Sequence, residues 1–476
     1  MEIMIHDMPN EQPSSSTRHE PSKQAANRML PALYQAVWRW HFYAGVIFAP
    51  FLIILAFSGA VYLFKPQIEG MLYKDMLTVT SVGVQPIGAD ELIAKTERAY
   101  PGTTISSITF SDAPDQTVKM TAIRNGAATT MYADPYTGQI KGMMNSDETF
   151  SAFFKKMHSE LVIGGTWANR LVELAACWGG ILVITGLYLW WPRNRAAIMG
   201  TILPRLSKPG SRIFWRDLHA VPAFWLSLGI LILIATGLPW SGVMGGQIDR
   251  IANATHTSYP PYAQSFLAKP ESVTLTKDVA EDVPWAAENI PVPQSMSGDY
   301  VRLPVQDIVG IADQREVNKP YTISMPQGQR GVYTISTAHD KPGRDATLHV
   351  DSYSGAVLTD VRFADYGVMA KAITLGIALH EGRLFGLANQ LLGLMTCMGL
   401  IVIAVSSYVM WRKRKPQGAL GAPGKPKNRK ASIGVVVIML LFGAIMPLVG
   451  LSILIILCLD LLLLRRIRRL QSWFSA

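Results

Sequence analysis

Long apolar runs alternate with polar segments along this chain. Four runs are long enough to cross a bilayer as helices of about 20 residues, at residues 42–64, 171–191, 219–240 and 389–411. A fifth apolar stretch, residues 432–464, is interrupted by IMPLVG and has basic sequences at both ends, KPKNRK and RRIRR. Two basic ends favour a helical hairpin whose ends share one side of the membrane. One long tilted helix is the alternative.

The two long segments between these spans have the pattern of small folded units. In the first, residues 89–101 have helical spacing, and TISSITF, TVKMTAI and TTMYA alternate as short strands before the turn DPYTG. The second repeats this order, with a helical stretch at 305–314, short strands and the turn DSYSG. We therefore predict two outer modules, each a helix followed by an antiparallel meander.

The membrane part of the sequence repeats as well. The first and third spans match at an offset of 178, which superposes His41 on His219 and Gly59 on Gly237. The second and fourth spans match at an offset of 220, which superposes Leu174, Cys177, Gly179, Tyr188 and Trp191 on Leu394, Cys397, Gly399, Tyr408 and Trp411. This repetition predicts a tandem duplication of span, outer module and span.

The expected fold is a membrane α-helical bundle, with four core spans and a C-terminal helical hairpin, that carries two extracytoplasmic α+β modules. The expected division is a disordered cytoplasmic tail at 1–30, the first span at 31–65, the first module at 66–147, an outer pre-helix and second span at 148–192, a cytoplasmic loop at 193–214, the third span at 215–240, the second module at 241–370, an outer pre-helix and fourth span at 371–415, a cytoplasmic loop at 416–431, the hairpin at 432–464 and a cytoplasmic tail at 465–476.

Composition agrees with a membrane protein. Of the 476 residues, 49% are hydrophobic and 16% charged, against about 25% charged in a soluble domain. The net charge of +10 comes from basic clusters beside the apolar runs, such as WWPRNR and WRKRK, rather than from a soluble basic face. These clusters favour positive-inside topology over nucleic-acid binding. They place the N-terminus in the cytoplasm and both modules outside, in the periplasm of a bacterial inner-membrane protein.

The three cysteines do not indicate a metal site or a disulfide framework. Cys177, Cys397 and Cys458 all lie inside apolar runs, without a CxxC motif or a histidine at ligand spacing. We expect them to be small buried apolar side chains.

Four of the nine histidines stand at or near the ends of the four main spans, one for each span. His41 and His219 stand at the cytoplasmic margin, whereas His158 and His380 stand outside, about ten residues before the apolar stretch. A haem iron takes two axial ligands on opposite faces, and facing helices of a bundle supply them as neutral imidazoles. We pair His41 with His219 for an inner haem b, and His158 with His380 for an outer haem b.

Other readings of these residues stay open. Any one histidine alone is typical of an interfacial or hydrogen-bonded side chain, and a zinc or copper site is a further alternative, although no carboxylate or thiol completes a tetrahedral set. Gly59 and Gly237 each follow a histidine by eighteen residues, five helical turns, and would leave room for the other porphyrin.

Two arginines close to the outer histidines are further candidates. Arg170 and Arg383 could hold haem propionates or contact a substrate, whereas local ion pairs with Glu173 and Glu381 are the simpler role. For the remaining histidines, we expect structural roles at His349, His256 and His339, and none at His6 and His19 in the tail.

Several motifs together resemble the PepSY-associated transmembrane family, iron-uptake-linked inner-membrane proteins that include ferric-siderophore reductases. They are RWHFYAG at the first span, LYLWWPR closing the second, the paired endings YADPYTGQI and HVDSYSGAVL, and the tail PLVGLSILIILCLDLLLLRR. The resemblance covers nearly all of the chain after residue 30. It implies PepSY-like periplasmic modules, haem in the membrane bundle, and reduction of ferric iron held by a siderophore. Some members carry a fused flavin reductase domain that does not fit here, which leaves the electron donor open.

The resulting hypothesis is a haem-dependent ferric-siderophore reductase. Electrons from a quinol or a cytoplasmic flavoprotein would cross the membrane and release iron as Fe(II). In one alternative, the spans only anchor modules that bind or regulate a periplasmic partner such as a peptidase. In another, the bundle transports a substrate or metal, although the spans lack the broken midplane helices and buried charges of many transporters.

Overall fold

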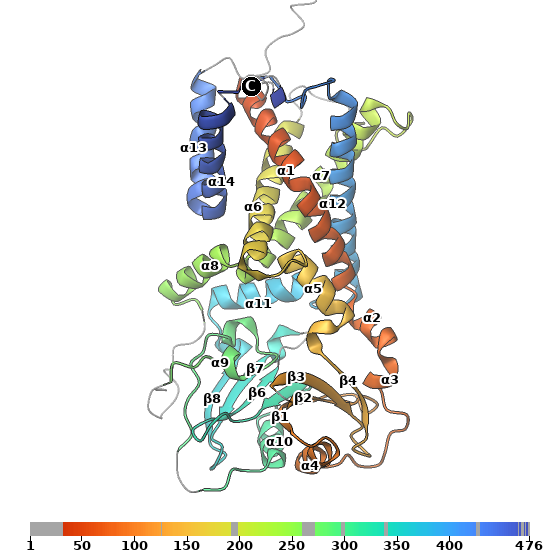
Figure 1. Ribbon diagram of the computed structural model, residues 1–476, viewed down its shortest axis with the longest axis vertical. Coiled ribbons are helices and arrows are strands. Elements are labelled where there is room, and N and C mark those ends of the chain that lie inside the picture. Colours follow the sequence, from red (N-terminus) through yellow and green to blue (C-terminus); the bar gives the residue numbers. More distant parts are fainter. Residues whose placement is uncertain are drawn as a thin grey trace, which may run out of the picture.

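Four long helices form the membrane part of the protein. The computed structural model describes residues 32–124, 126–191, 199–258, 272–296, 300–337, 341–424, 429–464, 466–467, 471 and 473–474. The tail at 1–30 and three histidines, His6, His19 and His339, lie outside these residues. The helices α1 (Ala32–Tyr62), α6 (Gly165–Trp190), α7 (Arg212–Gly237) and α12 (Leu387–Arg414) stand side by side (Figure 1). All four are long and apolar enough to cross a membrane, so the chain is a multi-pass membrane protein.

The helices extend beyond the apolar runs of the sequence. The first helix begins at Ala32, ten residues before its apolar run at 42, and the third begins at Arg212, seven residues before its run at 219. His41 and His219 therefore lie inside helices and not at their edges. In α7 the polar and aromatic residues before the apolar run continue the helix, because the Ser211 side chain caps it and no proline or glycine interrupts its first turns.

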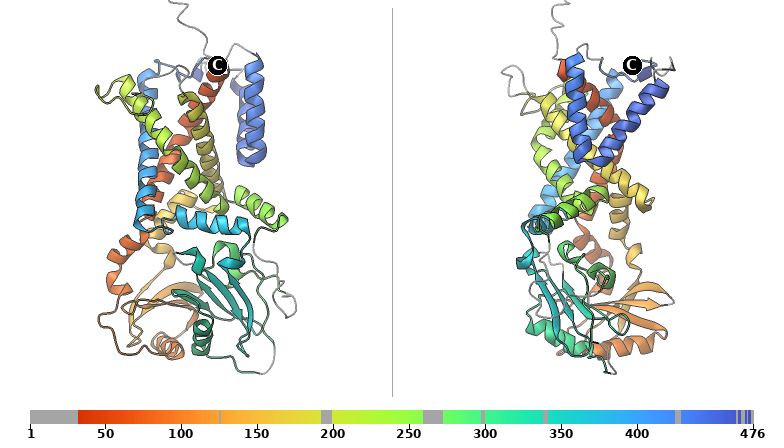
Figure 2. Two further views of the ribbon diagram at one scale, coloured as in Figure 1. Left: turned by 180° about the vertical axis from the view of Figure 1, so that it is seen from behind. Right: turned by 90° about the vertical axis from the view of Figure 1, so that its left-hand side faces the viewer.

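Helices α13 (Arg429–Ile445) and α14 (Pro447–Leu459) form the C-terminal hairpin (Figure 2). Pro447 lacks the N–H that a continuous helix needs, so the chain turns at this point. Gly443 and Gly450 let the two helices approach closely, because a Cβ atom at Gly443 would lie 2.9 Å from the Gly450 Cα. The sequence left two possibilities for residues 432–464, a helical hairpin and one long tilted helix, and the structure has the hairpin. Cys458 on α14 is exposed, contrary to our expectation, whereas Cys177 and Cys397 are buried.

The two expected modules form one continuous antiparallel sheet. The first contributes β1 (Thr103–Phe110), β2 (Val118–Arg124), β3 (Ala127–Ala133) and β4 (Ile140–Met144), and the second contributes β5 (Tyr321–Ser324), β6 (Tyr333–Thr337), β7 (Ala346–Val350) and β8 (Val357–Arg362). The strand order is β4-β3-β2-β1-β5-β6-β7-β8, so the halves meet where β1 pairs with β5. Ile108 lies opposite Ile323 in this pairing. We predicted the strands of each half from the sequence, but not their junction.

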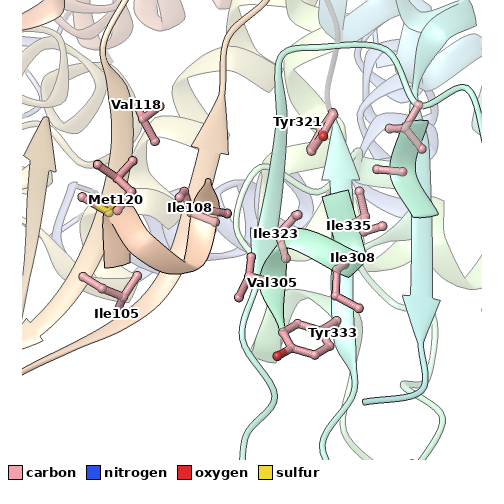
Figure 3. Close-up of a cluster of buried hydrophobic side chains, with 14 of the residues drawn as sticks. Ile105, Ile108, Val118, Met120, Val305, Ile308, Tyr321, Ile323, Tyr333 and Ile335 are labelled. Carbon is pink, nitrogen blue, oxygen red and sulfur yellow. The ribbon is translucent and has the colours of Figure 1, made fainter. Parts of the chain in front are cut away.

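One hydrophobic core runs across both halves of the sheet. Helices α4 (Ala89–Ala99) and α10 (Val305–Gln314) cover the face of the sheet that is turned away from the bundle (Figure 1). Figure 3 shows core side chains from both halves, among them Ile108, Met120, Ile308 and Ile323, which are fully buried. The Asp90 carboxylate accepts hydrogen bonds from the backbone N–H groups of Val305 and Gln306, which fixes α4 against α10.

Shorter helices lie between the bundle and the sheet or beside the sheet. Helices α5 (Phe150–Glu160) and α11 (Val368–His380) are the two pre-helices, and α8 (Val243–Ala254) lies across the end of the bundle (Figure 1). The remaining described helices are α2 (Lys65–Leu72), α3 (Lys74–Leu77) and α9 (Thr276–Val279), with short 3₁₀ turns that include η3 (Leu238–Trp240) and η4 (Trp285–Ala287). We call the end of the bundle that faces the sheet the sheet end, and the opposite end the far end.

Candidate functional site: two histidine pairs in one cavity

At the far end of the bundle, His41 of α1 faces His219 of α7. The centres of the two imidazole rings are 6.4 Å apart and the ring planes make an angle of 79°. His41 Nδ1 lies 2.9 Å from the Thr185 hydroxyl oxygen of α6, and His219 Nδ1 lies 2.9 Å from the Ile403 carbonyl oxygen of α12. All four long helices therefore position this pair.

At the sheet end, His158 of α5 faces His380, the last residue of α11. Their ring centres are 6.1 Å apart, with an angle of 69° between the planes. His158 Nδ1 lies 2.9 Å from the Leu55 carbonyl oxygen, and His380 Nδ1 lies 3.1 Å from the Thr236 hydroxyl oxygen. The structure thus brings together the same two pairs that the sequence predicts.

Hydrogen bonds fix the same tautomer at all four rings. A carbonyl oxygen only accepts, so Nδ1 of His158 and of His219 carries the proton and donates it. The hydroxyl groups of Thr185 and Thr236 already donate to backbone carbonyls at 2.7 Å, so they accept from the other two histidines. This leaves the lone pair of each ring on Nε2, the nitrogen that is then free to bind a metal.

A single cavity of about 1620 Å³ contains both histidine pairs. Its lining includes His41, His219, His158 and His380 together with apolar side chains of the four long helices. Typical small-molecule pockets have about 300–1,000 Å³, so this cavity has room for more than one large ligand. Across the described part of the chain, no group of three or more His, Cys, Asp or Glu side chains is arranged to hold a metal ion.

Glycines stand against three of the four rings. A Cβ atom at Gly59 would lie 3.2 Å from His158 Cε1, and one at Gly237 would lie 3.1 Å from His380 Cε1. Gly186 has the same relation to His41, at 3.3 Å. Side chains at these positions would crowd the rings, so the two glycines that the sequence singles out help to shape the sheet-end site. We did not identify Gly186 from the sequence.

The two arginines that we proposed for propionates or substrate have other contacts. Arg170 Nη1 lies 3.7 Å from the Glu173 carboxylate, and Arg383 Nε lies 2.6 Å from the Glu381 carboxylate. Neither arginine is among the residues that line the cavity. Of the two roles considered, their contacts match the local ion pair.

Glu173 has a larger role than an ion pair. Its side chain is 1% exposed, and its two carboxylate oxygens accept hydrogen bonds from Val243 N and Met244 N at 2.9 and 2.8 Å. These are the first two residues of α8, whose N–H groups have no partner within the helix. Glu173 thereby fixes the turn that connects α7 to α8. The sequence did not indicate this contact, because the partners are about seventy residues apart.

Several charged and aromatic residues of the cavity were missed from the sequence. At the far end, the lining includes Arg212, Arg216, Lys413 and Arg414. At the sheet end it includes Lys155 of α5, Trp240 of η3 and Glu288 of the second module, as well as Ser159 and Glu160. The basic clusters were interpreted only as topology signals, and nothing in the local sequence indicated that a module residue reaches the bundle.

The family described as the PepSY-associated TM region matches residues 38–414. This match spans most of the chain. The chain belongs to this family. No curated protein is similar enough to the chain to be counted as a relative. The matched PepSY-associated region includes α1 from residue 38 onward, the other three long helices, the sheet and all four cavity histidines, and it ends before the hairpin α13–α14.

The other described histidines of this PepSY-associated chain are separate from the cavity. His349 on β7 is fully buried, and its Nε2 and Nδ1 lie 3.1 and 3.0 Å from the hydroxyl oxygens of Thr276 and Thr334. Burial lowers the pKa of His349 to about 3, so it is a neutral structural residue. His256 is exposed on the chain that follows α8.

Proposed function

We propose that this protein is a haem-containing oxidoreductase of the bacterial inner membrane, which passes electrons outward to reduce ferric iron in a siderophore complex. The observation that carries the proposal is the spacing of the two histidine pairs. Paired imidazoles on facing helices are the ligands that would hold a haem iron in a helix bundle. The ring centres here are 6.4 and 6.1 Å apart.

The composition of each site supports haem over a bare metal ion. Each pair provides two imidazoles, and the described residues offer no third ligand nearby. Zinc and copper sites need three or four protein ligands, whereas a porphyrin brings four nitrogens of its own. The apolar walls and the size of the cavity also suit flat, largely apolar macrocycles.

The chain would contribute binding, orientation and insulation. Nε2 of His41 and His219 would hold the inner haem, and Nε2 of His158 and His380 the outer one, because Nδ1 of each ring is occupied by its hydrogen bond. Arg212, Lys413 and Arg414 line the far end and would be the cations nearest to the propionates of the inner haem, and Lys155 would be the one at the sheet end. When bound, haem supplies a one-electron Fe(III)/Fe(II) couple.

The direction of electron transfer rests on the positive-inside orientation. The far end, where the basic residues gather, would face the cytoplasm and receive electrons from a quinol or a cytoplasmic flavoprotein. The sheet would then lie in the periplasm, where the ferric siderophore arrives. Hard oxygen donors bind Fe(III) more tightly than Fe(II), so reduction would favour release of the iron.

The test is the reduced-minus-oxidised optical spectrum of the purified protein, with haem counted per chain. We expect low-spin b-type bands and two haems. His41→Ala and His158→Ala should each leave one haem, with bands that differ between the two variants, and His256→Ala, an exposed control, should leave two. A colourless protein from haem-replete cells, or loss of both haems in His256→Ala, would refute the proposal. The first result would favour a membrane-anchored module that binds a periplasmic partner.

A further inference from the structure

The two histidine pairs differ in the hydrogen bonds that their Nδ1–H groups donate. An imidazole that binds a metal through one nitrogen becomes a more basic ligand when its other nitrogen donates a hydrogen bond. A more basic axial ligand stabilises Fe(III) relative to Fe(II), which lowers the reduction potential of a haem. The number of acceptors around each ring therefore affects the potential of the site that the ring belongs to.

At the sheet end, His158 has two acceptors, both from α1. Its Nδ1 lies 2.9 Å from the Leu55 carbonyl oxygen and 3.2 Å from the Ser58 hydroxyl oxygen. The Ser58 hydroxyl donates its own hydrogen to the Ile54 carbonyl at 2.7 Å, so its oxygen is an acceptor for the ring. One N–H group of His158 is thus shared between a carbonyl and a hydroxyl oxygen.

The tandem repeat places the same two acceptors beside the second histidine of this end. Leu233 and Thr236 of α7 follow Leu55 and Ser58 at the offset of 178 that relates the first and third spans. His380 bonds to the backbone of Leu233, and its Nδ1 lies 3.1 Å from the Thr236 hydroxyl oxygen. Both rings of the sheet end therefore have a carbonyl and a hydroxyl acceptor.

The repeat does not hold at the far end. Among the described residues, each far-end ring has one acceptor, the Thr185 hydroxyl for His41 and the Ile403 carbonyl for His219, both at 2.9 Å. The position that follows Thr185 by 220 residues is Val405, which has no hydroxyl group. The far-end pair thus has two acceptors in total, whereas the sheet-end pair has four.

This difference suits the direction of electron transfer that we propose. Hard oxygen donors hold Fe(III) more tightly than Fe(II), so a ferric siderophore needs a strong reductant. More acceptors make the sheet end, which would face the periplasm, the more strongly reducing site. The membrane potential is negative inside and favours outward movement of an electron, so it can drive transfer from the far end to a site of lower potential.

We propose that the two sites hold haem at different reduction potentials, with the lower potential at the sheet end. Ser58 and Thr236 are positioning residues that lower the potential there, and Thr185 has this role at the far end. The inference rests on the proposed haem-containing reductase and names the side chains that tune its electron path. In the step between the sites, one electron leaves Fe(II) at the far end and enters Fe(III) at the sheet end, and no bond forms or breaks.

The test is a spectroelectrochemical titration of the purified full chain in detergent, in which the two haems titrate as separate one-electron components. His41→Ala would retain only the outer haem and His158→Ala only the inner one, so these variants assign each component. We expect the haem that remains in His41→Ala to have the lower potential of the two.

Variants of the hydroxyl groups test the cause. Thr185→Val should raise the reduction constant of the inner haem at least threefold, about 28 mV for a one-electron couple, and leave the outer haem unchanged. Ser58→Ala combined with Thr236→Val should raise that of the outer haem by a similar factor. Thr185→Ser keeps the hydroxyl and should titrate like the wild type. Thr374→Val is the matched control, because Thr374 is buried on α11 and donates to the Ala370 carbonyl at 2.9 Å, outside the cavity lining.

Haem content and gel-filtration profile show in parallel whether each variant is folded. A lower potential at the inner haem, an unchanged inner potential in Thr185→Val, or equal shifts in Thr185→Val and Thr374→Val would each overturn this inference, while a wild type with two haems would still support the proposed function. If Thr185→Val loses its haem, the double variant of Ser58 and Thr236 decides, and an unchanged outer potential overturns the inference. A wild-type protein without haem would overturn both proposals.

Discussion

The buried carboxylate of Glu173 allows a quantitative prediction. In Glu173→Gln the side chain keeps its size, but only one of its two end atoms can accept a hydrogen bond. One of the two N–H groups of Val243 and Met244 then faces an NH₂ group, and the other loses a charged acceptor. A buried unsatisfied donor costs about 1–3 kcal/mol, and a hydrogen bond to a charged group contributes about 1.5–3 kcal/mol. Allowing for relaxation of the exposed side of α8, we expect the start of this helix to be destabilised by about 2–3 kcal/mol.

The assay is hydrogen exchange with mass spectrometry on peptides that cover residues 243–254. Since about 1.4 kcal/mol corresponds to a factor of ten, local opening should be roughly 30- to 140-fold more frequent in Glu173→Gln. Glu91→Gln, an exposed carboxylate that pairs only with Lys95 at 3.1 Å, is the matched control and should leave this exchange unchanged. The reasoning is refuted if Glu173→Gln folds normally and exchanges at the wild-type rate in this segment.

Three further predictions concern other parts of the chain. Asn389→Leu removes the hydrogen bond from Asn389 Nδ2 to the Leu379 carbonyl beside His380, at 2.9 Å, whereas Asn169→Leu removes the equivalent bond to the Ser159 carbonyl, at 3.4 Å. If the proposed outer haem is bound, we expect the first variant to alter its low-spin electron paramagnetic resonance signal more than the second. Burial lowers the pKa of His349 from 6.5 to about 3, so the folded protein holds this side chain neutral. The free energy of unfolding should therefore fall by about 1.4 kcal/mol per pH unit below pH 6.5, or about 2 kcal/mol by pH 5. Thermal unfolding should show this fall in the wild type and a shallower one in His349→Asn. Asp90→Asn should lower the free energy of unfolding by about 1–2 kcal/mol, because the carboxylate accepts two backbone N–H bonds of α10 at 2.8 and 2.9 Å; an unchanged melting temperature would contradict this.

Much of the fold follows from local patterns. The alternation in TVKMTAI and the helical spacing of residues 305–314 each predict one element, because side-chain periodicity depends only on the element itself. The junction of β1 with β5 could not be predicted in this way. Ile108 and Ile323 are more than two hundred residues apart, and either half alone has a plausible four-strand pattern.

The histidine pairs were predictable because they repeat. His41 and His219 share one sequence offset with the residues around Gly59 and Gly237, so symmetry and topology together indicate which rings meet. Residues without a repeated partner gave no such signal. Trp240 resembles an ordinary membrane-interface tryptophan, and Glu288 lies in an irregular segment of the second module. Only the packing of η4 on α11 shows that this segment reaches the cavity.

The width of the continuous sheet also sets the distance between the helices that carry His158 and His380. Its two edge strands, β4 and β8, are the ones that lead into α5 and α11. Seven spacings of about 4.8 Å make the sheet about 34 Å wide, and helices of 11 and 13 residues together span about 36 Å at about 1.5 Å per residue. The two helices thus run inward from opposite edges of the sheet, and the ring centres of His158 and His380 lie 6.1 Å apart. The width of the sheet and the combined length of the two helices therefore have to match. One helical turn more or less, about 5.4 Å, would make the rings overlap or separate them.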